Sequence, residues 1–310
     1  MTTILLRSGI TLAAAAITAA SLVACSTNET DNTTLTFAAV PAESSASLEQ
    51  SFGNITALIE QETGAKVKFQ NASDYAAVIE GMRAGQVDIA SFGPFSYVIA
   101  KDSGVNLEPI VAPTNDPNEA PAYTSLAYVK ADSDIQTIND LRGKTVCFVD
   151  QASTSGYLVP MKGLKDEGID LDTDLTPMMA GGHDASLLAL DSGSCDAAFA
   201  HDAMLTTLAN SGQVEAEELR AVWESDPITE DPIAINRDTV SDELATKIVE
   251  VLRDKANKKD LVATGICASE AECELPEETE YGYVPVTDAD FTPIREICAA
   301  TDAPACKNVG

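Results

Sequence analysis

Residues 145–166 read TVCFVDQASTSGYLVPMKGLKD, and they fall into three successive segments. The first five residues are mostly apolar, which predicts a buried strand, and residues 156–166 have the pattern of a helix. The turn between them contains Ser153, Thr154 and Ser155. A strand, a turn of small polar residues and a helix make up the repeating unit of an α/β fold.

The same succession of strand and helix occurs before and after this unit. Further strands are expected over residues 35–40, 66–70, 87–92, 175–179 and 197–200, and helices over 48–62, 74–84, 94–103, 185–191 and 203–209. This alternation predicts an α/β fold with largely parallel sheets. Residues 123–130 separate two such blocks, which suggests two lobes.

The N-terminus has the features of a secretory signal. Arg7 is the only charged residue before position 25, and an apolar run follows it. The segment LVAC at 22–25 resembles a bacterial lipobox, in which Cys25 becomes the first mature residue and carries lipid; the alternative is an ordinary signal peptide with an incidental cysteine. We expect a signal peptide over 1–24 and a lipidated flexible tether over 25–34, because that run is polar and rich in small residues. An extracytoplasmic protein that contacts the membrane only through its lipid is therefore predicted.

The composition narrows the possible partners. The formal net charge is −30 at pH 7, which argues against a nucleic-acid partner because phosphate backbones require basic patches. The same charge opposes capture of a small anion. Screening over about 8–10 Å at physiological salt weakens this long-range repulsion, so dipoles inside a cleft can still hold an anion.

Seven cysteines divide into Cys25 and six others. An even number in an exported protein indicates disulfides, although six cysteines permit 15 pairings. Neighbouring strands could bridge one pair, and two further pairs would close short local loops. Our working pairing is Cys147–Cys195, Cys267–Cys273 and Cys298–Cys306. A metal site is not expected, since the chain has only two histidines and no tightly spaced cysteine pair.

Four strand-to-helix turns are candidates for a ligand site, because parallel sheets bind ligands beyond the carboxyl ends of their strands. They are residues 71–75, 91–97, 150–156 and 180–184. All are rich in glycine or hydroxyl residues. Backbone N–H groups and hydroxyls at helix N-termini can hold an anion without lysine or arginine.

Several motifs resemble those of phosphonate ABC-transporter substrate-binding proteins. They are Asp74-Tyr75-Ala76, Val87-Asp88-Ile89-Ala90, Ser153-Thr154-Ser155-Gly156-Tyr157-Leu158-Val159-Pro160, Gly182-His183 and Asp231-Pro232. The resemblance extends from about residue 35 to 237, and 292–295 is similar to the family's ending. It implies a type II periplasmic-binding-protein fold, with two lobes, a cleft between them and a two-crossing hinge. Lobe 1 would comprise 35–123 and 237–310, and lobe 2 would comprise 124–236.

The resemblance also implies roles for individual residues. Ser153, Thr154 and Ser155 would offer hydroxyls and helix-start N–H groups to phosphonate oxygens, although Ser153 could be only an N-cap. Tyr75 would donate its phenol from the opposite lobe, and His183 would donate a ring N–H. Asp231 would accept a hydrogen bond from a P–OH group or pair with a ligand amine, the alternative being a turn residue before a proline.

Three further residues are weaker candidates. Ser96 and Tyr97 lie in the second turn. Family members that bind aminoalkyl phosphonates have a glutamate where simple alignment places Ala203, and the adjacent Asp202 could substitute for it. Loss of that acid would favour ligands without an amine, such as phosphite, methylphosphonate or phosphate.

The function predicted from the sequence is therefore that of a monomeric binding lipoprotein without a cofactor. It would deliver a small phosphonate-type anion to an ABC permease. One alternative is a secreted serine hydrolase that uses His183, but no Gly-x-Ser-x-Gly elbow surrounds Ser153. The other is a sensor lipoprotein that uses this fold without transport.

Overall fold

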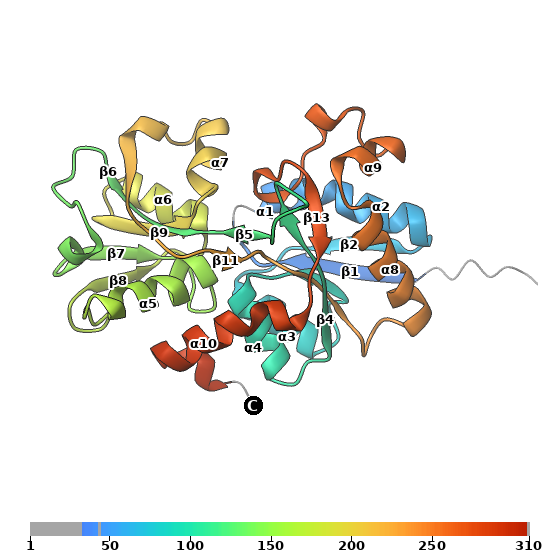
Figure 1. The fold of residues 1–310 in the computed structure, drawn as a ribbon, viewed down its shortest axis with the longest axis horizontal. Helices are drawn as coiled ribbons and strands as arrows, with labels where there is room; N and C mark the ends of the chain where they lie inside the picture. Colours follow the sequence, from blue (N-terminus) through green and yellow to red (C-terminus); the bar gives the residue numbers. More distant parts are fainter. Residues whose placement is uncertain (1–32, 43–44, 309–310) are drawn as a thin grey trace, which may run out of the picture. The chain divides into compact units, whose positions relative to one another are not determined.

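A computed structural model describes residues 33–42 and 45–308 of the chain (Figure 1). The expected signal peptide, the lipobox and Cys25 lie outside the described residues. Within the described part, no helix is long and apolar enough to cross a membrane, and no cluster of histidine, cysteine or acidic residues could hold a metal ion.

The first of two main sheets has six strands in the order β13-β4-β12-β3-β1-β2. Its strands are β1 (Thr34–Ala39), β2 (Lys66–Gln70), β3 (Ile89–Ser91), β4 (Leu107–Thr114), β12 (Ile233–Asn236) and β13 (Gly282–Pro285). The accompanying helices are α1 (Ser45–Ser51), α2 (Gly53–Thr63), α3 (Tyr75–Arg83), α4 (Pro94–Asp102), α8 (Asp242–Lys255) and α9 (Lys258–Ala263). These elements all lie either before residue 115 or after residue 232 in the chain.

The second sheet has five strands in the order β10-β6-β9-β7-β8. They are β6 (Ser125–Lys130), β7 (Thr145–Phe148), β8 (Thr176–Met179), β9 (Ala197–His201) and β10 (Leu219–Glu224). Its helices are a π-helical turn η2 (Thr154–Leu158) that continues into α5 (Val159–Asp166), then α6 (His183–Asp191) and α7 (Met204–Asn210). Short 3₁₀ turns lie at Ile138–Leu141, Ala216–Glu218, Glu270–Glu272, Pro276–Glu278, Asp288–Phe291 and Pro304–Asn308.

The two sheets are joined by a separate pair of strands. β5 (Ala122–Tyr123) and β11 (Ile228–Thr229) pair antiparallel with each other (Figure 1). The chain therefore passes from the first sheet to the second through β5 and returns through β11. The return occurs before the expected lobe boundary at 236, because β12 already pairs with β3 and β4 of the first sheet.

Both sheets are mixed rather than largely parallel, which corrects the expectation from the sequence. β1 pairs parallel with β2 and β3, and β7 pairs parallel with β8 and β9. β12, β13, β6 and β10 all pair antiparallel. The antiparallel strands include the segments that follow each crossing, because the chain enters each sheet there without a preceding helical crossover.

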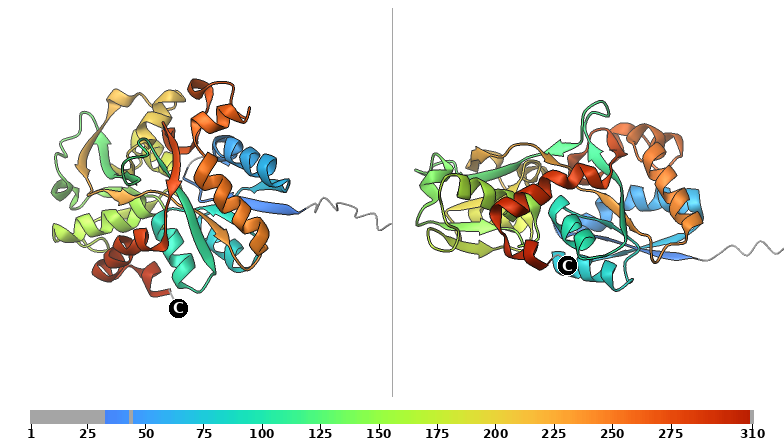
Figure 2. Two further views of the ribbon diagram at one scale, coloured as in Figure 1. Left: turned by 45° about the vertical axis from the view of Figure 1, so that its right-hand side comes forward. Right: turned by 60° about the horizontal axis from the view of Figure 1, so that its bottom comes forward.

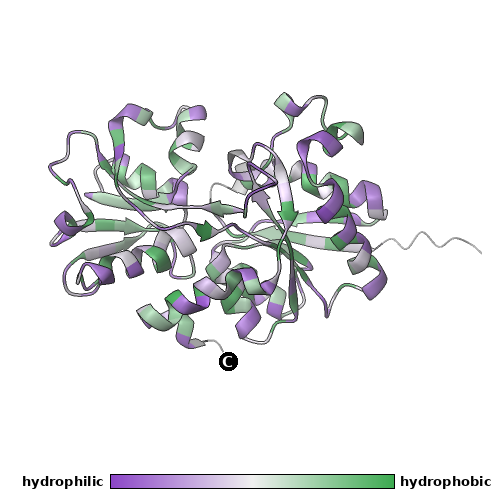
Figure 3. Ribbon diagram, viewed as in Figure 1, coloured by the Kyte–Doolittle hydropathy of each residue, from purple (hydrophilic) through white to green (hydrophobic). Residues whose placement is uncertain are grey.

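Alternation along the strands places apolar side chains on both faces of each sheet. On β3, Ile89 belongs to one hydrophobic cluster and Ala90 to another; on β7, Phe148 and Cys147 divide in the same way. Successive strand residues point to opposite faces, so each sheet needs helices on both sides. Green apolar positions accordingly concentrate along the strands and the helix faces that cover them (Figure 3).

The C-terminal helix α10 (Thr292–Thr301) packs against elements of both halves. It contacts α4 and α5, and Lys165 Nζ of α5 donates to the Ala300 carbonyl at 2.8 Å (Figure 2). The C-terminal segment was expected to belong to lobe 1 alone. Its contact with α5 means that α10 packs against both halves, in addition to the two chain crossings at β5 and β11.

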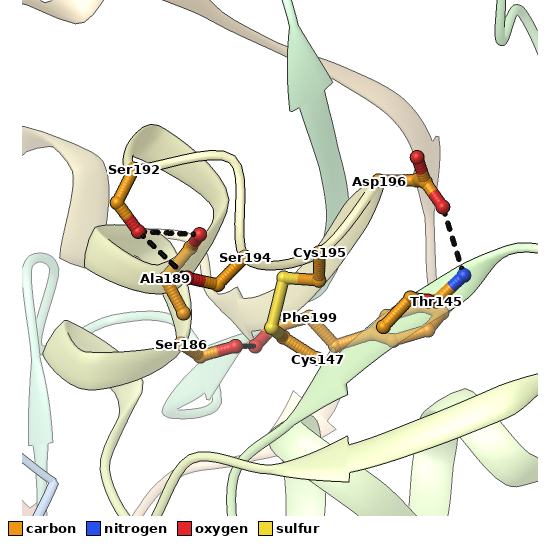
Figure 4. Close-up of a disulfide and its surroundings, with 9 residues drawn as sticks. All are labelled: Thr145, Cys147, Ser186, Ala189, Ser192, Ser194, Cys195, Asp196 and Phe199. Carbon is orange, nitrogen blue, oxygen red and sulfur yellow. Dashed lines mark hydrogen bonds between the residues drawn. A yellow bond between two sulfur atoms is a disulfide. The ribbon is translucent and has the colours of Figure 1, made fainter.

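Three disulfides join Cys147–Cys195, Cys267–Cys273 and Cys298–Cys306, the pairs named from the sequence. The first links β7 to the turn that enters β9 (Figure 4). The second closes a short loop just before the turn that contains Glu277. Such bonds persist in oxidising, extracytoplasmic compartments.

Candidate ligand site

A small cavity of about 10 Å³ lies where turns of the two sheets meet. Its wall is formed by Ala42, Tyr75, Gly93, Tyr123, Ser153, Thr154, Ser155, His183, His201, Asp231 and Glu277. Among the residues that the structure describes, no lysine or arginine lines it. The wall is thus made of hydroxyls, imidazoles, carboxyls and backbone.

The start of α4 contacts the start of η2 across this cavity. The Phe95 backbone N–H donates to Thr154 Oγ1 at 2.8 Å, although the two residues belong to helices of different sheets. Gly93 precedes α4, and a β-carbon at this position would lie 3.2 Å from Thr154 Oγ1. The close approach of the two helix starts therefore favours glycine here.

Ser153, Thr154 and Ser155 line the cavity and are all buried. Ser153 Oγ caps the helix by accepting from Gly156 N–H at 3.1 Å. The first N–H groups of a helix have no partner within the helix, so they remain able to bind an anion. A β-carbon at Gly156 would lie 2.4 Å from Val149 Cβ, which explains the glycine that follows the hydroxyl residues.

His183 begins α6, and its ring is fixed from behind by the other histidine. The His201 backbone N–H donates to His183 Nδ1 at 3.1 Å, so Nδ1 is an acceptor and the proton of the neutral ring lies on Nε2. Nε2 lies 3.4 Å from Ser153 Oγ. Burial, together with the neighbouring His201, lowers the pKa of His183 well below its usual value. His183 is therefore a neutral donor in the cavity wall, with its Nε2–H group facing Ser153 Oγ.

Two acidic residues, Glu230 and Asp231, directly follow β11. Burial raises the pKa of Asp231 well above its usual value, and the charge of Glu277 raises it further, whereas a hydrogen bond with Tyr123 lowers it. Burial and the charge of Glu277 also raise the pKa of Glu230. These acids consequently retain protons to higher pH than exposed carboxyls do.

Two tyrosines add phenol groups to the wall: Tyr75 from helix α3 and Tyr123 from the connecting strand β5. Burial raises the pKa of Tyr75, and the opposing effect of its hydrogen bond to Ser153 is smaller. The same holds for Tyr123, which hydrogen-bonds Ser155. Both phenols remain protonated at neutral pH and can donate to an anion.

Six of the predicted site residues line this cavity: Tyr75, Ser153, Thr154, Ser155, His183 and Asp231. They come from α3, η2, α6 and the segment after β11. A wall of donors beside the two carboxyls of Asp231 and Glu277 can hold a small oxyanion that carries a proton.

The structure places the three weaker candidates away from the cavity. Tyr97 donates its hydroxyl to Asp288 Oδ1 at 2.8 Å, within the apolar core beside α10. Ser96 Oγ donates to the Gly93 carbonyl inside α4. Asp202 Oδ2 accepts from the backbone N–H of Thr124 at 3.0 Å on an exposed surface. Asp202 therefore does not replace the missing glutamate, because its carboxylate is directed to the connecting segment.

Three residues of the cavity wall with polar side chains were missed from the sequence: Tyr123, His201 and Glu277. His201 ends β9, so a strand prediction extended by one residue would have placed it at the carboxyl end. Tyr123 ends β5, a strand of two residues. Glu277 has a positive φ of 60° in a turn after the Cys267–Cys273 disulfide, and no motif indicates its position.

The model of the family described as periplasmic substrate-binding proteins of phosphonate ABC transporters matches residues 37–269. The chain belongs to this family. It is 42% identical over 283 residues to the phosphate-import protein PhnD of Mycolicibacterium smegmatis, covering 88% of each chain. Members of this family are periplasmic substrate-binding proteins of ABC transporters.

Solved structures agree with this family membership. A binding protein component of an ABC phosphonate transporter from Pseudomonas aeruginosa superimposes with a TM-score of 0.76 at 25% identity, over 88% of this chain and 87% of that one. PhnD1 from Prochlorococcus marinus, solved with methylphosphonate, gives 0.75 at 17% identity over 88% and 100%. The fold is the type II periplasmic-binding-protein fold, as expected. The family is one of binding proteins rather than enzymes.

Proposed function

We propose that this protein binds a small phosphonate, phosphite or phosphate anion in the cavity between its two sheets and passes it to an ABC permease. The observation that carries the proposal is the convergence of six motif residues on one cavity. Two similar proteins, the phosphate-import protein PhnD of Mycolicibacterium smegmatis and PhnD1 of Prochlorococcus marinus in complex with methylphosphonate, support the same class of ligand.

In this proposal, the two sheets with their helices are lobes that separate to admit the ligand. A cavity of about 10 Å³ holds about one water molecule, so an oxyanion needs its walls to move apart. The strand pair β5 and β11 is the hinge, and the Phe95–Thr154 hydrogen bond is a contact that opening would break.

Binding would use neutral donors in place of cations. The helix starts at η2 and α6, the His183 Nε2–H group and the Tyr75 phenol surround three ligand oxygens. Asp231 shares one proton with the ligand: its carboxylate accepts a hydrogen bond from a P–OH group, or its protonated carboxyl donates one to a ligand oxygen. We further propose that lipid on Cys25 holds the protein at the cell membrane near its permease.

Isothermal titration calorimetry with phosphate, phosphite, methylphosphonate and 2-aminoethylphosphonate tests this function, with acetate as a control anion. We expect at least one phosphorus anion to bind and acetate not to bind. Thr154→Val should weaken that binding by roughly tenfold or more, since one hydrogen bond to an anion is lost. Thr246→Val, at an exposed hydroxyl in α8 whose Oγ1 donates only to Asp242, is the matched control. Failure of every phosphorus anion to bind the wild-type protein would disprove the proposal.

A further inference from the structure

His201 presents a polar atom that the folded chain leaves without a partner. The residue is 5% exposed, and among the described residues its Nε2 atom is the buried side-chain nitrogen or oxygen that has no hydrogen-bond partner. An unpaired buried polar atom is costly, so it is uncommon in native proteins and indicates a role. His201 lines the proposed ligand cavity, so this atom belongs to a residue of the cavity wall.

The position of His201 is fixed by two contacts that do not use Nε2. Its backbone N–H donates to His183 Nδ1, and its ring meets the His183 ring edge-on with centroids 4.7 Å apart. Both contacts leave Nε2 free to face a ligand. The geometry therefore holds the ring ready for a contact that the protein itself does not make.

His201 also lines a second, larger cavity of about 500 Å³. Four residues line both cavities: Ala42, His201, Asp231 and Glu277. The donors that would hold three oxygens of the ligand, at η2, α3 and α6, belong to other residues of the small cavity's wall. A ligand held in this way would direct its fourth substituent on phosphorus toward the residues shared by the two cavities, three of which are polar.

We propose that His201 contacts the fourth substituent on phosphorus and makes the site prefer inorganic phosphate to phosphite and alkylphosphonates. This inference rests on the proposed function. Phosphate has an oxygen in the fourth position, phosphite has a P–H bond, and methylphosphonate has a methyl group. Only the oxygen can pair with an imidazole nitrogen.

The pairing works for either tautomer of the neutral ring. Burial lowers the pKa of His201 to about 4, so the ring is neutral at pH 7 and carries one proton. Phosphate at this pH has both protonated and unprotonated oxygens, so it can accept from Nε2–H or donate to a bare Nε2. A methyl group at this position leaves Nε2 buried and unpaired, which is how a polar site rejects an apolar analogue.

Calorimetry with phosphate, phosphite and methylphosphonate on three proteins tests the inference: the wild type, His201→Phe and His201→Gln. Phenylalanine keeps an aromatic ring against His183 and the backbone donor, whereas glutamine keeps a polar side chain. We expect the wild type to bind phosphate about tenfold or more tightly than the other two ligands. The preference should collapse in His201→Phe and persist in part in His201→Gln. Thermal unfolding confirms that each variant is folded.

The outcomes separate this inference from the function on which it rests. Binding of phosphate and methylphosphonate with equal affinity by the wild type overturns the role of His201 but leaves the proposed function intact. Equal weakening of all three ligands in His201→Phe also overturns it, because the residue would then be only structural. If none of the three ligands binds the wild type, both proposals fail. If His201→Phe does not fold, the order of the three binding affinities, measured on the wild type and on His201→Gln, decides whether the inference holds.

Discussion

Substitution of Asp231 by asparagine should change how the stability of the ligand-free protein depends on pH. Burial and the charge of Glu277 raise the pKa of this carboxyl in the folded state, whereas an unfolded aspartate titrates near 4. Between these two pKa values, the folded protein binds more protons at this position than the unfolded chain does. The wild-type protein therefore loses stability as pH rises through this window.

The size of the effect follows from proton linkage. One proton taken up by the folded state alone changes the free energy of unfolding by about 1.4 kcal/mol per pH unit. Asparagine has nearly the same shape and cannot ionise, so the variant lacks this contribution. It should match the wild type near pH 4 and exceed it by up to about 1.4 kcal/mol for each further pH unit, until the raised pKa is passed.

Urea unfolding of the ligand-free protein from pH 4 to pH 8 measures this difference. Asp226→Asn, at an exposed position, is the matched control and should stay parallel to the wild type over the whole range. A constant difference between Asp231→Asn and the wild type at every pH would refute the reasoning. Asp231 would then be an ordinary carboxylate in a turn before Pro232.

Three further predictions concern the anchor, the disulfides and the helix start. Cys25→Ser should leave the protein unprocessed or released, which membrane fractionation detects; unchanged membrane association would exclude the lipobox. Maleimide labelling under denaturing, non-reducing conditions should modify none of the six paired cysteines, and two or more labels per chain would contradict the three bonds. Gly156→Ala should destabilise the protein by roughly 1–3 kcal/mol in urea unfolding, because the new methyl group overlaps Val149. Gly53→Ala, with open space around it, should differ little, and equal effects would argue against this packing.

The parts of the fold that sequence patterns predicted are those in which a strand leads directly into a helix. The segment from Thr145 to Asp166 is one example, since its apolar run, hydroxyl turn and glycine each have a local cause. Six site residues were predicted because they stand in such turns or in family motifs. In these segments local propensity and tertiary structure require the same residues.

Patterns failed where distant segments decide the structure. β12 is four apolar or amide residues whose place between β3 and β4 depends on the return of the chain through β11. Glu277 reaches the cavity from a turn held by a local disulfide, beyond the part of the chain that the family model matches. Neither position has a periodic signal of its own. His201 was missed because the expected strand ended at residue 200, whereas β9 extends to His201. Asp202 was a candidate only because it adjoins Ala203 in the family alignment, and the alignment does not give the direction of its side chain.

The negative net charge of the chain is compatible with the proposed anionic ligand once the proton shared between Asp231 and the ligand is taken into account. The net charge of −30 is spread over a screened surface, whereas the cavity wall offers N–H groups, hydroxyls and a neutral histidine beside the carboxyls of Asp231 and Glu277. Each negative charge beside the ligand weakens that attraction. The raised pKa of Asp231, to which the charge of Glu277 contributes, limits this repulsion, because a carboxyl that keeps or shares a proton adds a hydrogen bond without adding a charge. In the proposed function, the acids of the site and the absence of a cation from the described cavity wall are two parts of one solution: the site would hold an anion together with one proton.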